Sequence, residues 1–135
     1  MTEPARRWTF EAGAEVARAR AWEKCEVRTF GCQGRDSQTH HRQARGMGGV
    51  SGEGMSVNRP SCLLRVCLNC HNTIESRREW ARRRGLLVHR PADPGAVPVY
   101  LNSVNGTGWF VLTDEGMYVW QDLPEDYSAI ASLAA

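Results

Sequence analysis

Cysteines are the residues of this chain whose spacing most clearly predicts chemistry. Cys67 and Cys70 form a CxxC pair, and a second pair, Cys25 and Cys32, lies about 35 residues upstream. Four thiolates converge readily on a tetrahedral zinc ion, and a structural zinc would help to fix a small domain with long glycine-rich loops. The first pair has six intervening residues, whereas about two to four are usual. We therefore predict a structural Zn²⁺ site with four cysteine ligands, one of whose pairs is unusually spaced.

A redox-active dithiol at Cys67 and Cys70 is the alternative to this zinc site. Such a pair favours a helix N-terminus and a βαβ context. The sequence predicts the helix but not the βαβ pattern. The fifth cysteine, Cys62, is interpreted as buried apolar filler.

Three of the four histidines lie beside these thiols in the sequence. Adjacent residues on a strand point to opposite faces, so we expect His40 and His41 to divide their roles. One can bind a metal while the other, neutral at about pH 7, takes a proton from water. His71 opens a predicted helix and Glu75 follows four residues later, so both side chains project from one helix face toward a shared cation. Each histidine alone is more often structural or solvated, and it is their combination with the cysteines that points to a site.

An α+β fold is needed to position these residues. Alanine-rich sequence with interspersed Glu and Arg predicts an N-terminal helix, and Gly85 ends a later one. The predicted elements are, in chain order, a helix over 10–24, a strand over 37–43, a long glycine-rich loop over 44–61, a strand over 62–66 and a helix over 71–84.

The last third of the chain has a different composition and predicts a small antiparallel β meander. Short β-branched and aromatic runs alternate there with turn signals such as Asn105-Gly106. The expected strands cover 86–89, 97–101, 109–113 and 117–120. The aromatic residues are interpreted as a packing face rather than a base-stacking platform, because their surroundings are acidic; they are Trp109, Phe110, Tyr118 and Trp120.

Charge is distributed unevenly along the 135 residues, although the net charge is only +2. Residues 1–90 hold all 17 basic residues and carry a net charge of +8, whereas residues 91–135 hold six acidic residues and no basic one. Sixteen of the bases are arginines, whose planar guanidinium binds phosphate bidentately. Arginine richness can also reflect a GC-rich genome, but the arginine clusters favour a polyanionic partner.

Length and hydropathy limit the remaining alternatives. A chain of 15.1 kDa fits one domain with a single core, and mean hydropathy of −0.47 without a long apolar run predicts neither a membrane span nor general disorder. The first ten residues lack the apolar stretch of a secretory signal. We therefore expect a cytoplasmic protein with reduced cysteines and no membrane partner or small-molecule cofactor.

Several of these motifs together resemble the HNH endonucleases, also called ββα-metal or His-Me finger nucleases. The resemblance extends over about residues 20 to 120. Within the family, the chain is most similar to the small HNH proteins of actinobacteria and their phages, which implies the cytoplasm of a bacterium or of a phage-infected host. Its specific part is the His40-His41 pair together with Cys70-His71 and the downstream Glu75. It implies a zinc-stabilised ββα-metal core over 25–85, preceded by an N-terminal helical extension over 1–24 and followed by an acidic β-rich extension over 86–135.

Specific roles for individual residues are implied by this resemblance. His41 matches the general base, while His40 and His71 match the ligands of a catalytic metal. Glu75 stands where many members have a histidine, so the ion is expected to be a hard one such as Mg²⁺ or Mn²⁺. The activity implied is metal-dependent hydrolysis of DNA, by nicking or double-strand cleavage, and the arginines expected to position the phosphate are Arg42, Arg45, Arg77 and Arg78.

One position departs from the family pattern and leaves two further hypotheses. Cys62 stands where the family has an asparagine that orients the base, and Asn58, four residues earlier, is the candidate to replace it. A catalytically weak or inactive nucleic-acid-binding protein on the same scaffold is the alternative function. A role beside a phage terminase in DNA packaging, with the acidic meander as the docking element, is compatible with either.

Overall fold

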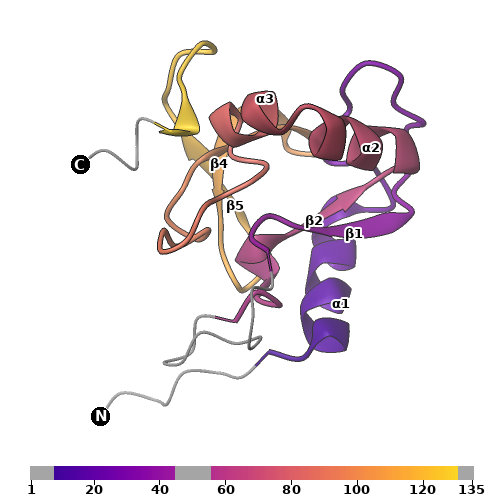
Figure 1. Cartoon of the computed structure of the whole chain (residues 1–135). Helices are drawn as coiled ribbons and strands as arrows, with labels where there is room; N and C mark the ends of the chain where they lie inside the picture. Colours follow the sequence, from indigo (N-terminus) through magenta and orange to yellow (C-terminus); the bar gives the residue numbers. More distant parts are fainter. Residues whose placement is uncertain (1–7, 45–55, 131–135) are drawn as a thin grey trace.

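The computed structural model describes residues 8–44 and 56–130, and the first element of the described chain is a helix (Figure 1). The hydroxyl of Thr9 accepts a hydrogen bond from the backbone N–H of Ala12 at 3.1 Å, which satisfies one of the unpaired donors at the start of α1 (Phe10–Ala21). The helix ends where Trp22 adopts a left-handed conformation, with φ of 56°. The predicted N-terminal helix is confirmed, and it stops three residues earlier than expected.

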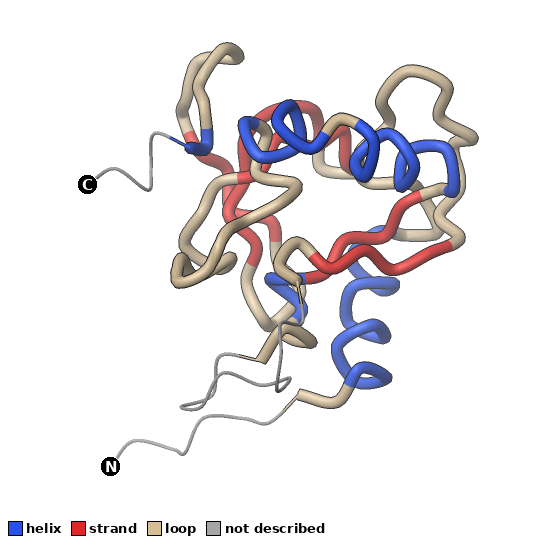
Figure 2. Tube along the Cα trace, viewed as in Figure 1, coloured by secondary structure: helices blue, strands red, loops and turns tan. Residues whose placement is uncertain are grey.

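Two antiparallel strands and a helix follow α1 in the order ββα. β1 (Gln38–His41) pairs with β2 (Leu63–Val66), with His40 opposite Leu64 and His41 opposite Leu63. A single 3-10 turn, η1 (Pro60–Cys62), leads into β2, and α2 (Leu68–Ser76) follows directly. Figure 2 shows α2 above the two strands and α1 below them. β1 is therefore placed so that His40 faces the start of α2.

The helix expected over 71–84 is two helices. α2 starts at Leu68 because the Cys67 sulfur accepts the N–H of Cys70 and caps the helix earlier than the sequence indicated. Arg77 leaves the helical region, with φ of −122° and ψ of 60°, and α3 (Arg78–Arg83) begins after it. The chain then turns at Gly85, where φ is 75° and a Cβ atom would lie 2.1 Å from the Pro98 carbonyl oxygen.

A three-stranded antiparallel sheet forms the last part of the described chain, in the order β3-β4-β5. Its strands are β3 (Val99–Ser103), β4 (Gly106–Leu112) and β5 (Tyr118–Gln121). The meander is confirmed, but the strand expected over 86–89 is wrong. That segment contacts the end of β1 by a backbone hydrogen bond from the Val88 N–H to the Arg42 carbonyl oxygen at 2.6 Å. Three prolines follow it between residues 90 and 99, and they have no N–H with which the pairing could be extended.

The aromatic packing face is confirmed only in part. Trp109 and Phe110 are buried, whereas Trp120 is 57% exposed. The Trp120 ring lies over Gly108, where a Cβ atom would come within 2.5 Å of it, so the strand surface needs a glycine at that point. The expectation is therefore corrected for Trp120, which covers backbone at the surface instead of filling the core.

One hydrophobic core joins the ββα unit and the three-stranded sheet. Its buried members come from both parts of the chain and include Leu64, Val66, Ile74, Ala81, Val99, Leu101, Phe110 and Leu112. Separate extensions over 1–24 and 86–135 remain a prediction. Among the described residues, no helix has the length and apolar character needed to cross a membrane.

Candidate metal centres

The four predicted cysteines converge on one point. Cys25 and Cys32 lie on the loop after α1, and Cys67 and Cys70 lie at the start of α2; the four sulfur atoms are all within 4.8 Å of one another. The Cys32 and Cys67 sulfurs are 3.8 Å apart, which is too long for a disulfide. A tetrahedral zinc with Zn–S bonds of about 2.3 Å places its sulfur ligands about 3.8 Å apart. The cluster therefore fits a structural zinc, and the convergence of four sulfurs favours a metal over a dithiol pair.

A tight turn accommodates the six-residue spacing of the first cysteine pair. The Cys25 N–H donates to the Gly34 carbonyl oxygen at 3.1 Å, and Gly31 and Gly34 have φ values of 80° and 88° that few other residues adopt. The chain thus returns on itself, and Cys32 reaches the same point as Cys25. The usual CxxC geometry is not needed for convergence.

Backbone amides stabilise the sulfur of Cys67 as an anion. N–H groups of Gln33 and Cys70 point at this sulfur from 3.4 and 3.3 Å. Burial alone would raise the pKa of the Cys67 thiol, but these donors outweigh it and lower the pKa to about 7. The thiolate is the form that binds zinc. Cys62, by contrast, is 1% exposed, and burial raises its pKa, as expected for an apolar filler.

A second group unites His40 on β1 with His71 and Glu75 on α2. One ligand atom from each lies within 4.8 Å of the others. The two imidazole rings are 5.4 Å apart between centroids and meet edge to face. His71 and Glu75 are one helical turn apart, and β1 approaches this face of α2 because β2 leads directly into the helix. The predicted grouping of these three residues is present and could hold a metal.

Hydrogen bonds fix which nitrogen of each imidazole carries its proton. Nε2 of His40 donates to the Leu86 carbonyl oxygen at 2.8 Å, so the lone pair lies on Nδ1. Nδ1 of His71 lies 2.5 Å from the amide oxygen of Gln38, which leaves Nε2 toward Glu75 at 3.8 Å from its Oε1. Outer hydrogen bonds of this kind orient metal-binding imidazoles. Burial lowers the pKa of His40 to about 4, so this ring is neutral and able to bind a cation near pH 7.

The histidine and glutamate group opens toward the surface. His40 is 2% exposed, but the side chains of His71 and Glu75 are 30% and 50% exposed. Three protein ligands with an accessible side leave coordination positions for water or a substrate oxygen. Glu75 also accepts a hydrogen bond on Oε2 from Arg78 at 2.8 Å.

His41 is positioned separately from this group. Its ring stacks on Phe10 of α1, with centroids 5.7 Å apart, and its Nε2 lies 3.1 Å from the amide oxygen of Asn58. In the tautomer that donates this hydrogen bond, the basic lone pair lies on Nδ1. The hypothesis that Asn58 replaces the family asparagine thus has a direct contact in its favour.

Arg42 is buried, which corrects its predicted role in phosphate binding. Its side chain is fully enclosed and donates hydrogen bonds of 2.8 to 2.9 Å to four backbone carbonyl oxygens, those of Ser61, Gly85, Pro94 and Val97. Burial lowers the pKa of Arg42 to about 10, so it stays charged near pH 7. Its guanidinium therefore ties the end of β1 to η1 and to the segment after α3, and its hydrogen bonds go to these carbonyl groups rather than to a DNA phosphate.

The other arginines predicted to bind phosphate lie in different places. Arg45 lies outside the described residues. Arg77 is exposed at the break between the helices, and Arg78 is half-exposed and bonded to Glu75. Arg82, which was not predicted as a site residue, is one turn from Arg78 on the same face of α3. Their spacing of four residues is a signal that could have identified the pair.

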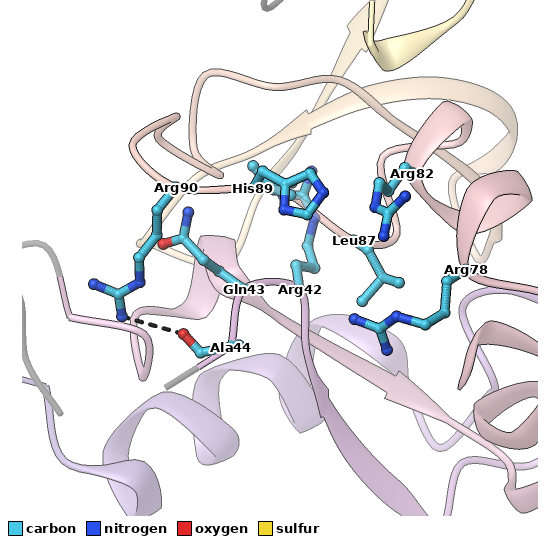
Figure 3. A pocket seen from close by; sticks show the side chains of 9 residues that line it. Arg42, Gln43, Ala44, Arg78, Arg82, Leu87, His89 and Arg90 are labelled. Atoms are coloured by element: carbon cyan, nitrogen blue, oxygen red, sulfur yellow. Dashed lines mark hydrogen bonds between the residues drawn. The ribbon is translucent and has the colours of Figure 1, made fainter. Parts of the chain in front are cut away.

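A basic pocket adjoins Arg78 and Arg82 (Figure 3). Its cavity has a volume of about 280 Å³. The residues lining it come from the end of β1, from α3 and from the segment after it; they are Arg42, Gln43, Ala44, Arg78, Arg82, Leu87, Val88, His89 and Arg90. No sequence pattern indicated His89 and Arg90, because the fold alone brings them to this place.

The structure supports a small α+β fold with a four-cysteine cluster and a His40, His71 and Glu75 group that could hold a metal. The resemblance to HNH endonucleases stays a prediction from the sequence motifs. Comparison of the chain with models of known protein families, with curated proteins and with solved structures finds no match.

Proposed function

We propose that this protein is a metal-dependent DNA endonuclease of the HNH type, with a zinc-stabilised ββα-metal core. The observation that carries the proposal is the approach of His40 on β1 to His71 and Glu75 on α2, with oriented nitrogens and an accessible side. His41 follows His40 directly, and its contact with Asn58 supports a second, separate role for this imidazole. The activity, the substrate and the family assignment are inferred from this arrangement.

Each residue has one task in the proposed hydrolysis. His41, held by Asn58 through Nε2, takes a proton at Nδ1 from the water that attacks the scissile phosphate. His40, His71 and Glu75 would hold a divalent cation such as Mg²⁺ or Mn²⁺, which supplies Lewis-acid stabilisation of the charge on the phosphorane and the leaving 3′ oxygen. Arg77 and Arg78, both exposed where α2 ends and α3 begins, are proposed to contact the DNA backbone. The products would carry a 5′-phosphate.

A second candidate function is DNA binding without cleavage. The observation that favours it is the 2.8 Å hydrogen bond between Arg78 and Glu75, which engages one carboxylate oxygen and competes with a cation for it. In that case the arginine-rich surface would still bind DNA phosphates, and affinity would fall steeply with salt. A phage terminase remains a proposed partner for the acidic C-terminal part in either case.

Plasmid nicking separates these functions. The full chain is incubated with supercoiled plasmid and Mg²⁺, Mn²⁺ or Ni²⁺, beside His41→Ala and an Arg35→Ala control at an exposed surface ion pair. We expect cleavage by the parent and the control, and a loss of about 10²- to 10⁴-fold in His41→Ala. Cleavage that is unchanged in His41→Ala would remove His41 from the mechanism. Binding without cleavage under every metal would support the second function.

A further inference from the structure

The basic pocket beside α3 has two chemically different surfaces. Its floor contains Leu87 and Val88, and Figure 3 shows the guanidinium groups of Arg78 and Arg82 reaching from α3 toward Leu87. Arg90 lies on the opposite side, near Ala44. None of the described residues that line the pocket is acidic.

These surfaces together suit a nucleotide better than a bare phosphate. The arginines alone would be enough to bind a phosphate, which makes no favourable contact with an apolar floor. A nucleobase presents an apolar face to aliphatic side chains and stacks on guanidinium planes, while its phosphate pairs with arginine. A cavity of about 280 Å³ lies near the lower limit of small-ligand pockets, which fits one nucleotide rather than a protein segment.

The pocket is joined directly to the candidate metal group. The Leu86 carbonyl that orients His40 precedes the floor residue Leu87, and the Val88 N–H bonds the Arg42 carbonyl oxygen at the end of β1. On the other side, Arg78 bonds Glu75. A strand whose phosphate meets the metal group therefore has its neighbouring nucleotide within reach of the pocket.

We propose that this pocket holds one unpaired nucleotide of the DNA strand, adjacent to the phosphate that is cleaved. A base that is stacked and paired inside a duplex cannot enter a side pocket without leaving the helix. The substrate class is then DNA with an unpaired nucleotide at the cleavage site, such as a bulge, an overhang or a single strand. This inference rests on the proposed function, because that function places the strand over the metal group.

Binding to hairpin DNA without added divalent ions tests the pocket independently of cleavage. Fluorescence anisotropy compares a hairpin with one bulged thymidine, the same hairpin with a bulged abasic residue, and a hairpin without a bulge. We expect the full chain to bind the thymidine bulge at least about fivefold more tightly than the abasic bulge, since stacking of one base contributes this much or more. Equal affinity for the two bulges would overturn the proposal.

Three variants localise the effect. Leu87→Ala removes part of the floor and should abolish the preference for the base. Arg82→Ala should weaken binding to both bulged hairpins, because each retains the phosphate. Arg83→Ala is the matched control, since its side chain is 60% exposed, pairs with Glu79 at 2.7 Å and does not line the pocket. An equal loss in Arg82→Ala and Arg83→Ala would contradict the proposal, and Arg82→Ala still tests it should Leu87→Ala fail to fold.

Two further outcomes distinguish this inference from the proposed nuclease activity. A preference for the thymidine bulge in a protein that cleaves neither the plasmid nor the bulged hairpin with Mg²⁺, Mn²⁺ or Ni²⁺ would retain the pocket and reject only the hydrolysis. Cleavage without any base preference would retain the nuclease and reject the pocket. Displacement of the bulged hairpin by free thymidine monophosphate at low concentration would assign the pocket to a free nucleotide and would likewise overturn the proposal.

Discussion

The two clusters of candidate metal ligands differ in how far they are closed off from solvent. In each, the ligand atoms lie within 4.8 Å of one another. Three of the four cysteines are completely buried, whereas Glu75 of the other group is half-exposed. Four protein ligands fill a tetrahedral coordination shell, and three with an open side do not. Ligand number and exposure, rather than spacing, therefore distinguish the cysteine cluster from the proposed reactive site.

The two clusters also differ in what holds their ligand atoms in place. Backbone N–H groups surround the sulfurs of Cys32 and Cys67, and these donors cannot move without unfolding the loop or the helix. Glu75 is held by the side chain of Arg78, which is half-exposed and can release it. The cysteine cluster is thus built into the backbone, and the histidine cluster depends on side chains that can rearrange.

The largest expected effect is the loss of one cysteine. Cys67→Ser removes a zinc ligand and the cap of α2, and we expect the zinc to be lost together with the cooperative unfolding transition, because binding of structural zinc contributes about 10 kcal/mol or more to small domains. Zinc per chain by mass spectrometry and thermal unfolding by circular dichroism measure this. Glu75→Gln is the comparison and should keep both the zinc and the fold. A parent chain that is folded without zinc contradicts the assignment of the four cysteines.

A smaller effect should appear when the pH falls. The pKa of His40 is about 4 in the folded chain and about 6.5 when unfolded, so the unfolded state binds the proton more readily between these values. Stability from His40 is then fully present above pH 6.5 and decreases as the pH falls toward 4, by about 3 kcal/mol in total. Urea unfolding at several pH values measures the slope, and His40→Gln should flatten it. An identical slope in the variant contradicts burial of a neutral imidazole at this position.

Asn58 provides a more moderate test of how His41 is oriented. Asn58→Ala removes the acceptor of the His41 Nε2 hydrogen without touching either metal cluster. We expect plasmid cleavage to decrease about tenfold, as for other residues that orient a reactive side chain, with zinc content unchanged. An activity equal to that of the parent would mean that the contact does not orient the base.

The smallest expected effect concerns the competition for Glu75. Arg78→Ala releases Oε2 of Glu75 and should tighten Mn²⁺ binding by up to about fivefold, because an exposed pair contributes about 1 kcal/mol at most. Calorimetric titration with Mn²⁺ measures this, with Arg83→Ala as the control on the same helix. Weaker Mn²⁺ binding in Arg78→Ala would show that the arginine supports the cation site instead of competing with it.

Spacing along the chain predicted the local pairs of each cluster, whereas the approach of His40 to His71 was implied only by the resemblance to HNH endonucleases. Cys67 and Cys70 belong to one turn of helix, as do His71 and Glu75, and strand alternation separates His40 from His41. The direction of each imidazole could not be predicted, because its partner is a distant carbonyl or amide, as with Leu86 for His40.

Interactions between segments that are distant in the sequence account for the predictions that were wrong. Arg42 has the residue type of a phosphate ligand, but its carbonyl partners lie 19 to 55 residues away in the sequence, and no local pattern indicates them. The strand expected over 86–89 has suitable residues, but the described segment forms a backbone hydrogen bond from Val88 to Arg42, just beyond β1, and no ladder. The exposure of Trp120 follows from the glycine beneath it on the neighbouring strand.

Anomalous diffraction from crystals soaked in Mn²⁺ tests the central claim, the functional division between the two clusters, most directly. The account predicts a zinc peak among the sulfurs of the four cysteines and a separate manganese peak next to Nδ1 of His40, Nε2 of His71 and the carboxylate of Glu75. No manganese between these three side chains, in crystals whose cysteines hold zinc, would contradict it.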